Sequence, residues 1–283
     1  MENNSIVKNS ESIDEAIDFR ELFKVLWDGK ALVVAVTSIF SVAAVIYSLS
    51  LPNIYQSNAY LSPVGEQVGT GQGIQGMGGL ASFAGISLSP QAGGSKSIKA
   101  IEKLNSLSFF SENILPNIFL PDLMAIDSWD ESSNSIEYQK NIFDKETQAW
   151  TGEIPTAQQS YRAFKENLRI SKDELTGFVT IAVKHQSPYV AKEWTELIVN
   201  ELNDFFRAKD KIEAKAAINF LNAQIAQTSF TEIKQVIAQL LQEKTQQLTL
   251  IEVNDFYVFE YIDPPAVMEK KVEPTRSFIC ILG

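Results

Sequence analysis

The chain has 283 residues, of which 45% are hydrophobic and 21% are charged, and its formal net charge is -11 at pH 7. This composition fits one or two folded domains with a real core and excludes a globally disordered chain. The acidic balance disfavours nucleic acid as a partner, because neutralising phosphates requires clustered Lys and Arg side chains. It also disfavours a peripheral protein held by anionic lipids.

Cysteine and histidine each occur once, as Cys280 and His185. No disulfide can form within the chain, and two such residues cannot supply the roughly four ligands of a Cys/His zinc site. We therefore expect no metal and no cofactor. A Ser-His-Asp arrangement could use only His185, which we interpret instead as a solvated side chain at the end of a strand.

The first predicted element precedes a long apolar segment. Residues 1–17 are polar and are expected to be disordered. A helix is predicted over 17–30, where apolar residues recur at helical spacing: Phe19, Leu22, Phe23 and Leu26.

The apolar segment covers residues 31–51, ALVVAVTSIFSVAAVIYSLSL, and contains no charge, Pro or Gly. At 1.5 Å per residue, a helix of this length reaches about 30 Å, which matches the hydrocarbon core of a bilayer. A helix also pairs every backbone polar group internally, as lipid requires. Trp27 before the segment and Tyr47 and Tyr55 near its end suit the two interfaces. We predict a transmembrane helix here.

Two alternatives to a membrane span are disfavoured by the sequence. A cleaved signal peptide is disfavoured, because a polar stretch precedes the segment, the apolar run is too long, and no A-x-A site follows it. A buried helix of a soluble protein is disfavoured by the length and continuity of the run.

Basic residues give the orientation. Arg20, Lys24 and Lys30 lie just before the apolar segment, and the next basic residue is Lys96. The positive-inside rule then puts the N-terminus in the cytoplasm and most of the chain outside. We expect a protein of the bacterial inner membrane with its bulk in the periplasm.

A strand and a glycine-rich segment follow. Residues 54–63, IYQSNAYLSP, are rich in β-favouring residues and predict a strand. Residues 65–95 are dominated by Gly, Ser, Gln and Ala, which is typical of a flexible loop. Within it, residues 71–76 match G-x-G-x-x-G. A dinucleotide site would need a strand just before this motif and a helix opening at its end, and we predict neither.

Three shorter elements come next. Apolar residues at helical spacing predict helices over 97–114 and 160–168. Residues 178–184, FVTIAVK, alternate as a strand does.

A long stretch without Gly or Pro, residues 191–263, has apolar residues at four-three spacing. It predicts a helix of about 38 residues and about 57 Å, a break near Thr228, and a second helix of about 23 residues. Residues 229–232, SFTE, have the form of a capping box. The sparse apolar stripe indicates partial burial, completed either by neighbouring copies or by an ordinary intramolecular hairpin.

Glutamines on these helices could hydrogen-bond sugar, although a solvated or subunit-facing surface is the simpler interpretation. They are Gln224, Gln227, Gln235 and Gln239.

The last elements lead to a second apolar run. Residues 254–262, NDFYVFEYI, carry aromatic residues on both faces and predict a central strand. The prolines that follow predict a stiff linker back to the bilayer. Residues 277–283, SFICILG, are too few to cross a bilayer, and we interpret them as the start of a second spanning helix, truncated in this chain. The alternative is a short apolar tail packed on the domain.

The predicted organisation follows from these elements. It comprises a cytoplasmic segment (1–30), a transmembrane helix (31–51), a periplasmic domain (52–276) and an incomplete second span (277–283). Within the periplasmic domain we expect a base at 52–188 and 253–266, with long helices at 189–252.

Several motifs together, in order and spacing, make the chain similar to the Wzz-type chain length determinant proteins, or polysaccharide co-polymerases. The similarity runs from about Ile17 to the last residue. The motifs are IDFRELFKVLWDGK before the apolar segment, IYQSNAYLSP after it, GGLASFAGISL, LTGFVTIAVKHQSPYVAKEW, and FEYIDPPAVMEKKVEPTRSFI.

The resemblance implies an α+β protein: a membrane-anchored periplasmic α/β base domain with a long helical extension, flanked by transmembrane helices. It further implies a homo-oligomeric ring that regulates the chain length of O-antigen of lipopolysaccharide, or a related glycan. The partners would be an inner-membrane polysaccharide polymerase and the growing lipid-linked glycan.

The proline-rich motif of that family also implies candidate contacts to the polymerase. They are Pro264, Pro265, Pro274 and Arg276. Backbone geometry near the membrane is the alternative role for each. The chain departs from the family in its incomplete second span, and in Val267 and Met268, where relatives often carry another Pro. Nothing here carries the nucleotide-binding motif of the kinase that some relatives fuse.

Three classes of function remain open. The first is a non-enzymatic structural regulator of chain length, which we favour. The second is a glycan hydrolase, which needs two carboxyl groups about 5–10 Å apart in a cleft, and the sequence does not pair them. The third is an extracytoplasmic sensor or a polysaccharide-export adaptor domain.

Overall fold

The computed structural model describes residue 27, residues 29–64 and residues 91–282. The predicted helix at 17–30 and the motif at 71–76 lie outside these residues, apart from the end of that helix. The chain forms two compact units, Met1–Leu51 with Thr275–Gly283, and Pro52–Pro274. We describe each unit by itself.

The first unit contains the apolar segment as the helix α2, Lys30–Ser50. Its apolar side chains are exposed, with Leu32 at 71% and Ile39 at 68%. Within the described residues, α2 is the one helix long and apolar enough to cross a membrane, judged by length and composition. The short helix α10, Arg276–Leu282, packs against α2 in the same unit. The helix predicted at residues 31–51 is therefore present, as α2.

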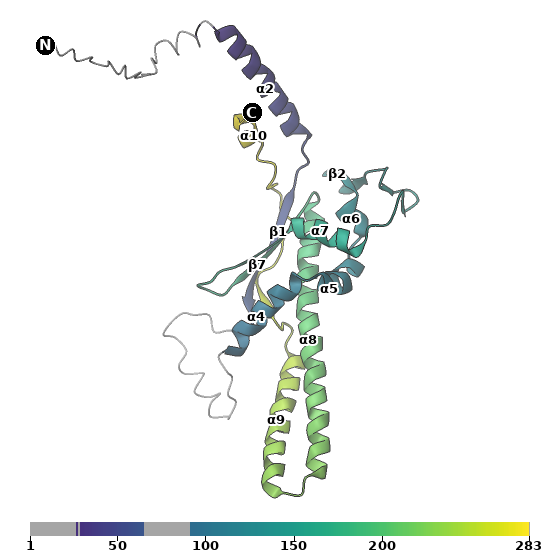
Figure 1. The fold of residues 1–283 in the computed structure, drawn as a ribbon, viewed down its shortest axis with the longest axis vertical. Helices are drawn as coiled ribbons and strands as arrows, with labels where there is room; N and C mark the ends of the chain where they lie inside the picture. Colours follow the sequence, from purple (N-terminus) through teal and green to yellow (C-terminus); the bar gives the residue numbers. More distant parts are fainter. Residues whose placement is uncertain (1–26, 28, 65–90, 283) are drawn as a thin grey trace, which may run out of the picture. The chain divides into compact units, whose positions relative to one another are not determined.

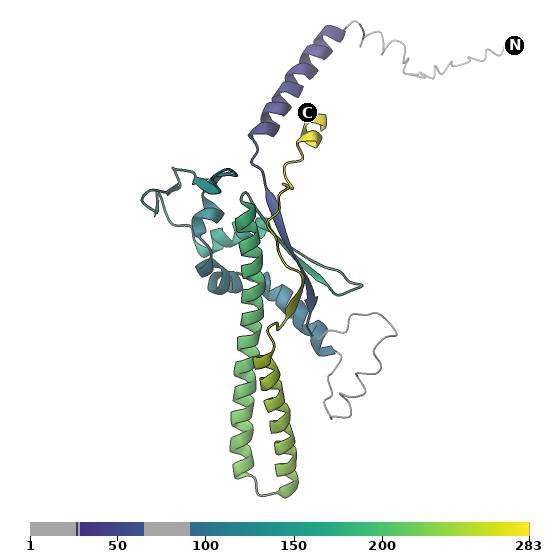
Figure 2. The same cartoon turned by 180° about the vertical axis from the view of Figure 1, so that it is seen from behind.

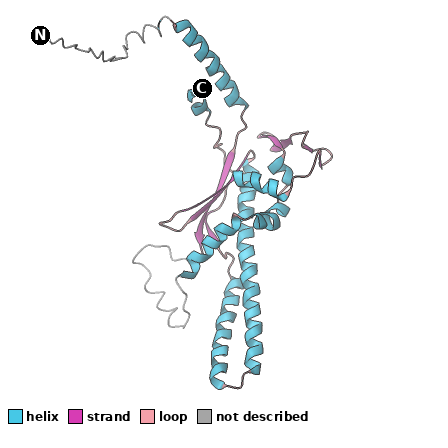
Figure 3. Ribbon diagram, viewed as in Figure 1, coloured by secondary structure: helices cyan, strands magenta, loops and turns pink. Residues whose placement is uncertain are grey.

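The second unit is organised around a four-stranded antiparallel sheet, in the order β6-β7-β1-β8 (Figure 3). Alternate residues of β1 are buried, from Tyr55 through Ala59 to Pro63, as expected for a strand with one face on a core. Ala59 lies opposite Ile181 in the register with β7. The strands are β1 (Tyr55–Pro63), β6 (Leu168–Lys172), β7 (Val179–His185) and β8 (Phe259–Asp263).

The predictions for β1 and β7 are confirmed, whereas the third strand prediction is partly wrong and the strand β6 was missed. The strand predicted at 254–262 begins only at Phe259, and β8 is an edge strand rather than a central one, because it pairs with β1 alone. The aromatic residues that suggested a central strand partly serve another purpose, since Tyr257 packs on a helix before the strand begins. The strand β6 was not predicted: Leu168 and Ile170 alternate with Arg169 and Ser171, but the run has only five residues and directly follows a helix.

Helices and small hairpins complete the base of the second unit. The helix predicted at 97–114 is interrupted: Ser106 is extended, and its hydroxyl accepts the Phe109 N–H as the cap of a new turn. Thr156 and Gln159 form a capping box that starts the predicted second helix at Ala157. The elements are α4 (Gln91–Leu104), α5 (Leu107–Phe109), the π-helix η1 (Phe110–Ile114), the 3-10 helix η2 (Leu115–Asn117), α6 (Leu120–Met124), β2 (Ile126–Asp130), β3 (Ser135–Tyr138), β4 (Phe143–Asp144), β5 (Ala149–Trp150) and α7 (Ala157–Asn167).

The longest helix, α8, spans Pro188–Gln227, about 60 Å at 1.5 Å per residue. Its first half lies against β1 and β7, where Trp194, Ile198 and Leu202 are buried in the core. Its second half extends beyond the sheet and pairs with the antiparallel helix α9, Thr231–Val253 (Figures 1 and 2). Both helices and the break between them were predicted.

The structure of the α8–α9 hairpin contradicts the predicted capping box, and it leaves open whether neighbouring copies complete the burial of the apolar stripe. The expected capping box at 229–232 does not form: Phe230 is the N-cap of α9, and its side chain cannot accept a hydrogen bond. Thr228 bonds back to the Gln224 carbonyl instead (2.8 Å) and ends α8. The hairpin is intramolecular, yet several apolar side chains on it are exposed, among them Ile212, Phe220, Val236 and Leu250.

His185 is buried rather than solvated, which corrects the sequence interpretation. Its side chain is 6% exposed and meets the Trp194 ring at 5.1 Å. The Ser187 N–H donates to Nδ1 (2.9 Å), so Nε2 carries the proton of the neutral ring and donates to the Asp122 carbonyl (3.0 Å). The chain turns into α8 directly after the strand, and this turn encloses the ring. Burial lowers the pKa of His185.

This burial predicts a pH dependence of stability. Below pH 6.5, the ordinary pKa of His, the unfolded chain binds a proton that the folded chain excludes. The free energy of unfolding should therefore fall as the pH falls through 6.5, by up to about 1.4 kcal/mol per pH unit. Urea unfolding followed by tryptophan fluorescence from pH 7.5 to 5 measures this.

His185→Gln provides the comparison, because the chain has one histidine and the variant has none. The variant should be less stable at pH 7.5 but lose less stability on acidification. Parallel curves for the two proteins would contradict the assignment.

Candidate functional site

The three prolines carried over from the family motif lie in the segment that follows β8. Pro264 is exposed, Pro265 is buried and Pro274 is half-buried. The Ser57 hydroxyl, on β1, donates to the Ala266 carbonyl (2.9 Å), which holds this segment along the central strand. Among these prolines, Pro264 therefore presents the largest fraction of its surface for contact with another molecule.

The two ends of the second unit are paired with each other. The Ile54 N–H donates to the Glu273 carbonyl (2.9 Å), and the Val272 N–H donates to the Ile54 carbonyl (2.8 Å). Glu273 also forms an ion pair with Lys184 of β7. Lys271 adds a hydrogen bond to Asn53 (2.8 Å). The chain therefore enters and leaves this unit at one place.

Arg276 belongs to the first unit, where it contacts the end of α2. Its Nε donates to the Ser48 carbonyl (3.2 Å), and its Nη2 lies 3.4 Å from the Leu51 carbonyl. Carbonyls at a helix C-terminus lack partners within the helix and carry partial negative charge, so a guanidinium stabilises them. The last turn of α2 has no basic residue of its own. This contact gives Arg276 a local structural role.

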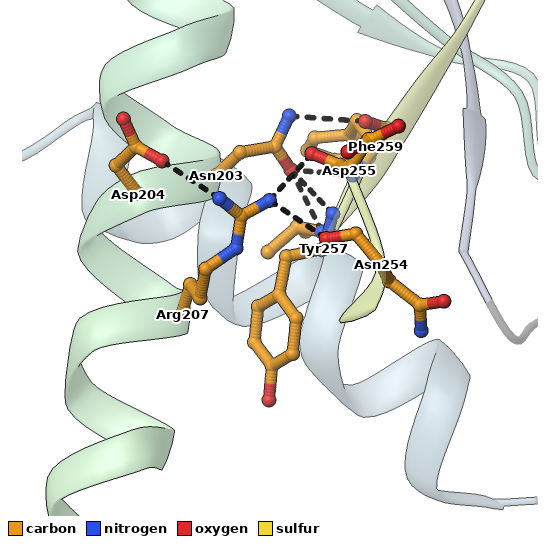
Figure 4. A network of polar contacts seen from close by, with 8 residues as sticks. Asn203, Asp204, Arg207, Asn254, Asp255, Tyr257 and Phe259 are labelled. Atoms are coloured by element: carbon orange, nitrogen blue, oxygen red, sulfur yellow. Dashed lines mark hydrogen bonds and ion pairs between the residues drawn. The ribbon is translucent and has the colours of Figure 1, made fainter. Parts of the chain in front are cut away.

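A polar cluster, which the sequence did not predict, joins α8 to the chain returning from α9 (Figure 4). At its centre is Asn203, 5% exposed. Its Oδ1 accepts the N–H groups of Tyr257 (3.4 Å), Val258 (2.7 Å) and Phe259 (3.0 Å), and its Nδ2 donates to the Phe259 carbonyl (3.0 Å). One side chain thus makes four contacts with the backbone where β8 begins.

Arg207 extends this cluster by one turn of α8. Its Nη2 donates to the carbonyls of Asn254 (3.2 Å) and Asp255, just after α9 ends. Its Nη1 lies 3.3 Å from Asp204. The positive charge therefore lies at the C-terminus of α9, where it is electrostatically favourable.

Tyr257 and Asp210 bring a third element into the cluster. The Tyr257 hydroxyl donates to Asp210 (2.5 Å), which also forms an ion pair with Lys96 of α4 (2.9 Å). The Lys96 ammonium lies 4.0 Å from the centroid of the Tyr257 ring. Burial, with the nearby Asp210, raises the pKa of Tyr257, so the phenol remains a hydrogen-bond donor. We call Asn203, Arg207, Asp210 and Tyr257 the hairpin anchor.

The glutamines considered as sugar contacts lie in the turns on either side of the connection between α8 and α9. Gln224 is half-buried, and the others are exposed: Gln227, Gln235 and Gln239. This exposure fits a solvated surface, and a contact with sugar stays a prediction.

Comparison with known proteins agrees with the family resemblance found in the motifs. The described residues form a mixed helix and strand fold with a long helical hairpin, and among them one apolar helix is long enough to cross a membrane. Residues 15–114 match the family model Wzz, described as Chain length determinant protein. The match spans the apolar helix, β1 and the helices up to Ile114, and it confirms the resemblance over this part of the chain. It supports a role in regulating chain length.

A search of the curated proteins found no match. Among solved structures, a full-length bacterial polysaccharide co-polymerase is similar at 13% sequence identity and a TM-score of 0.36, covering 94% of this chain and 92% of that one.

The hairpin anchor yields a direct prediction. Asn203→Ala leaves up to three N–H groups without their acceptor, and we expect it to lower the free energy of unfolding by about 2–4 kcal/mol. Amide hydrogen exchange at 257–259 should become faster, which mass spectrometry measures. Asn222→Ala, at an exposed position of α8, is the matched control and should change stability by less than about 0.5 kcal/mol. Unchanged exchange at 257–259 in Asn203→Ala would contradict the role of the anchor.

Proposed function

We propose that this chain is a non-enzymatic regulator of polysaccharide chain length that acts as a membrane-anchored scaffold of several identical copies. The observation that carries the proposal is the match of residues 15–114 to the chain length determinant family. The matched residues include both the apolar helix α2 and the first strand of the sheet, β1. The match therefore covers the proposed membrane helix as well as the start of the second unit.

Anchoring in the bacterial inner membrane is supported by α2. Apolar side chains along this helix are exposed, and lipid is the solvent in which such exposure costs nothing. Basic residues lie just before the apolar run, and the positive-inside rule then favours a cytoplasmic N-terminus with residues 52–276 in the periplasm. The apolar residues of α10 pack on α2, and we propose that they begin a second span.

The scaffold is proposed to act on an inner-membrane polymerase and on its growing lipid-linked glycan, O-antigen or a related polysaccharide. Assembly of several copies is supported by Phe220, Val236 and Leu250, which are exposed on the hairpin, because neighbouring copies could bury them. The time for which such an assembly retains the chain or its polymerase would set the length of the product.

The decisive experiment is deletion of the gene, followed by gel electrophoresis of the cell's polysaccharide. Deletion should replace a distribution with a preferred length by one dominated by short chains, and plasmid-borne expression should restore the preferred length. A ladder that deletion leaves unchanged would reject the proposal.

Contact between the proline-rich segment and the polymerase is tested separately. We expect Pro264→Ala to shift the preferred length while the variant accumulates normally and unfolds at the same temperature, because the ring is exposed and supports no core. Lys270→Ala, at another exposed position of the segment, should leave the ladder unchanged. An unchanged ladder with Pro264→Ala would assign this proline to backbone geometry alone.

A further inference from the structure

A hollow of about 470 Å³ lies beside α8, where the π-helix η1 approaches it. Its volume falls within the range of small-molecule sites, and its lining combines apolar with polar side chains, as such sites do. All of its residues belong to the second unit. They are Asn113, Glu201, Asp204, Phe205, Ala208, Lys209 and Ile212.

The apolar part of the hollow is held in a fixed position. The Phe205 ring is half-buried and packs edge-to-face with Phe109 (5.7 Å) and Phe206 (5.3 Å). The Lys103 ammonium lies 4.8 Å from its centroid. Ile212, in contrast, is 68% exposed at the far end of the hollow. A ligand would therefore meet a pre-positioned aromatic ring and an accessible aliphatic side chain.

The polar part combines acceptors with donors. Glu201 accepts a hydrogen bond from Asn117 (3.2 Å), and partial burial with the nearby Asp204 raises its pKa. Asp204 is exposed and contributes a second carboxylate. Asn113 and Lys209 add an amide and an ammonium group. Such a mixed set can bond several hydroxyl groups, each of which both donates and accepts.

We propose that this hollow binds one or two uncharged sugar units of the polysaccharide on which the chain acts. A sugar ring offers hydroxyl groups to the four polar side chains and C–H groups to Phe205 and Ile212. The two carboxylates disfavour an anionic sugar. The inference rests on the proposed function, since that function supplies the polysaccharide.

A second copy of the chain is a less suitable occupant. An apolar helix seated in the hollow would remove Glu201 and Asp204 from water without giving them hydrogen bonds, which is costly for a carboxylate. A sugar replaces the lost water with its own hydroxyl groups, so the polar side chains stay paired.

The binding test uses the full chain in detergent and the lipid-free polysaccharide released by mild acid from the cells that produce it, titrated by calorimetry. Ala208→Trp fills the hollow from an exposed position and should weaken binding at least about tenfold. Ala223→Trp, exposed on the same helix but outside the hollow, is the matched control and should bind as the parent chain does. Glu201→Gln keeps the shape of the side chain, removes its charge, and should weaken binding severalfold.

Three results would overturn the inference: no binding by the parent chain, equal weakening by both tryptophan variants, or equal competition by oligogalacturonate, an acidic sugar chain. Sedimentation of Ala208→Trp tests whether the hollow serves contact between copies of the chain instead. A changed assembly with unchanged sugar affinity would assign the hollow to contact between copies and reject the proposal.

Failure of this inference is distinguishable from failure of the proposed function. If deletion leaves the polysaccharide ladder unchanged while the purified chain still binds sugar, the proposed function fails and the binding site stands. If deletion alters the ladder but the hollow does not bind sugar, the opposite holds.

Discussion

The hairpin depends on one side chain, Asn203, which joins α8 to the backbone that returns from α9. Without its amide, N–H groups at Tyr257, Val258 and Phe259 would be buried without this acceptor. The same contacts fix where β8 begins and therefore its register on β1, with Leu61 opposite Tyr261. A helix that leaves the sheet is thus closed at its base by backbone hydrogen bonds as well as by apolar packing.

Beyond the hairpin anchor, the hairpin and the base differ in how many of their side chains are buried. The base has a continuous core of sheet and helix side chains, whereas the outer half of α8 buries Ala214 and little else. Substitutions in the hairpin therefore disturb few core contacts, and its exposed surface can be occupied by partners. The hollow lies at the boundary between the two regions, where Phe205 is still fixed by the core while Ile212 already meets solvent.

How far the sequence predicted the structure depended on the length of each signal. A long uninterrupted apolar run predicted α2, long periodic patterns predicted α8 and α9, and alternation predicted β7, because each of these signals extends over many residues. Single residues were misinterpreted or missed when their environment came from distant segments. His185 was interpreted as solvated but is enclosed by α6 and α8. Asn203 was not singled out, because its partners come from the chain that returns from α9. The motifs pointed to the family whose model matches residues 15–114, but they could not place the hollow, since its residues come from η1 and α8, which are far apart in the chain.

The pairing of Ile54 with Glu273 has a consequence for how such a protein can change over time. A body whose two ends meet can be grafted into a loop of an unrelated scaffold, or onto different anchors, without stretching any connection. Residues Pro52–Pro274 could therefore be exchanged as one unit. Recombination at these two borders would replace the whole second unit and leave the first unit unchanged.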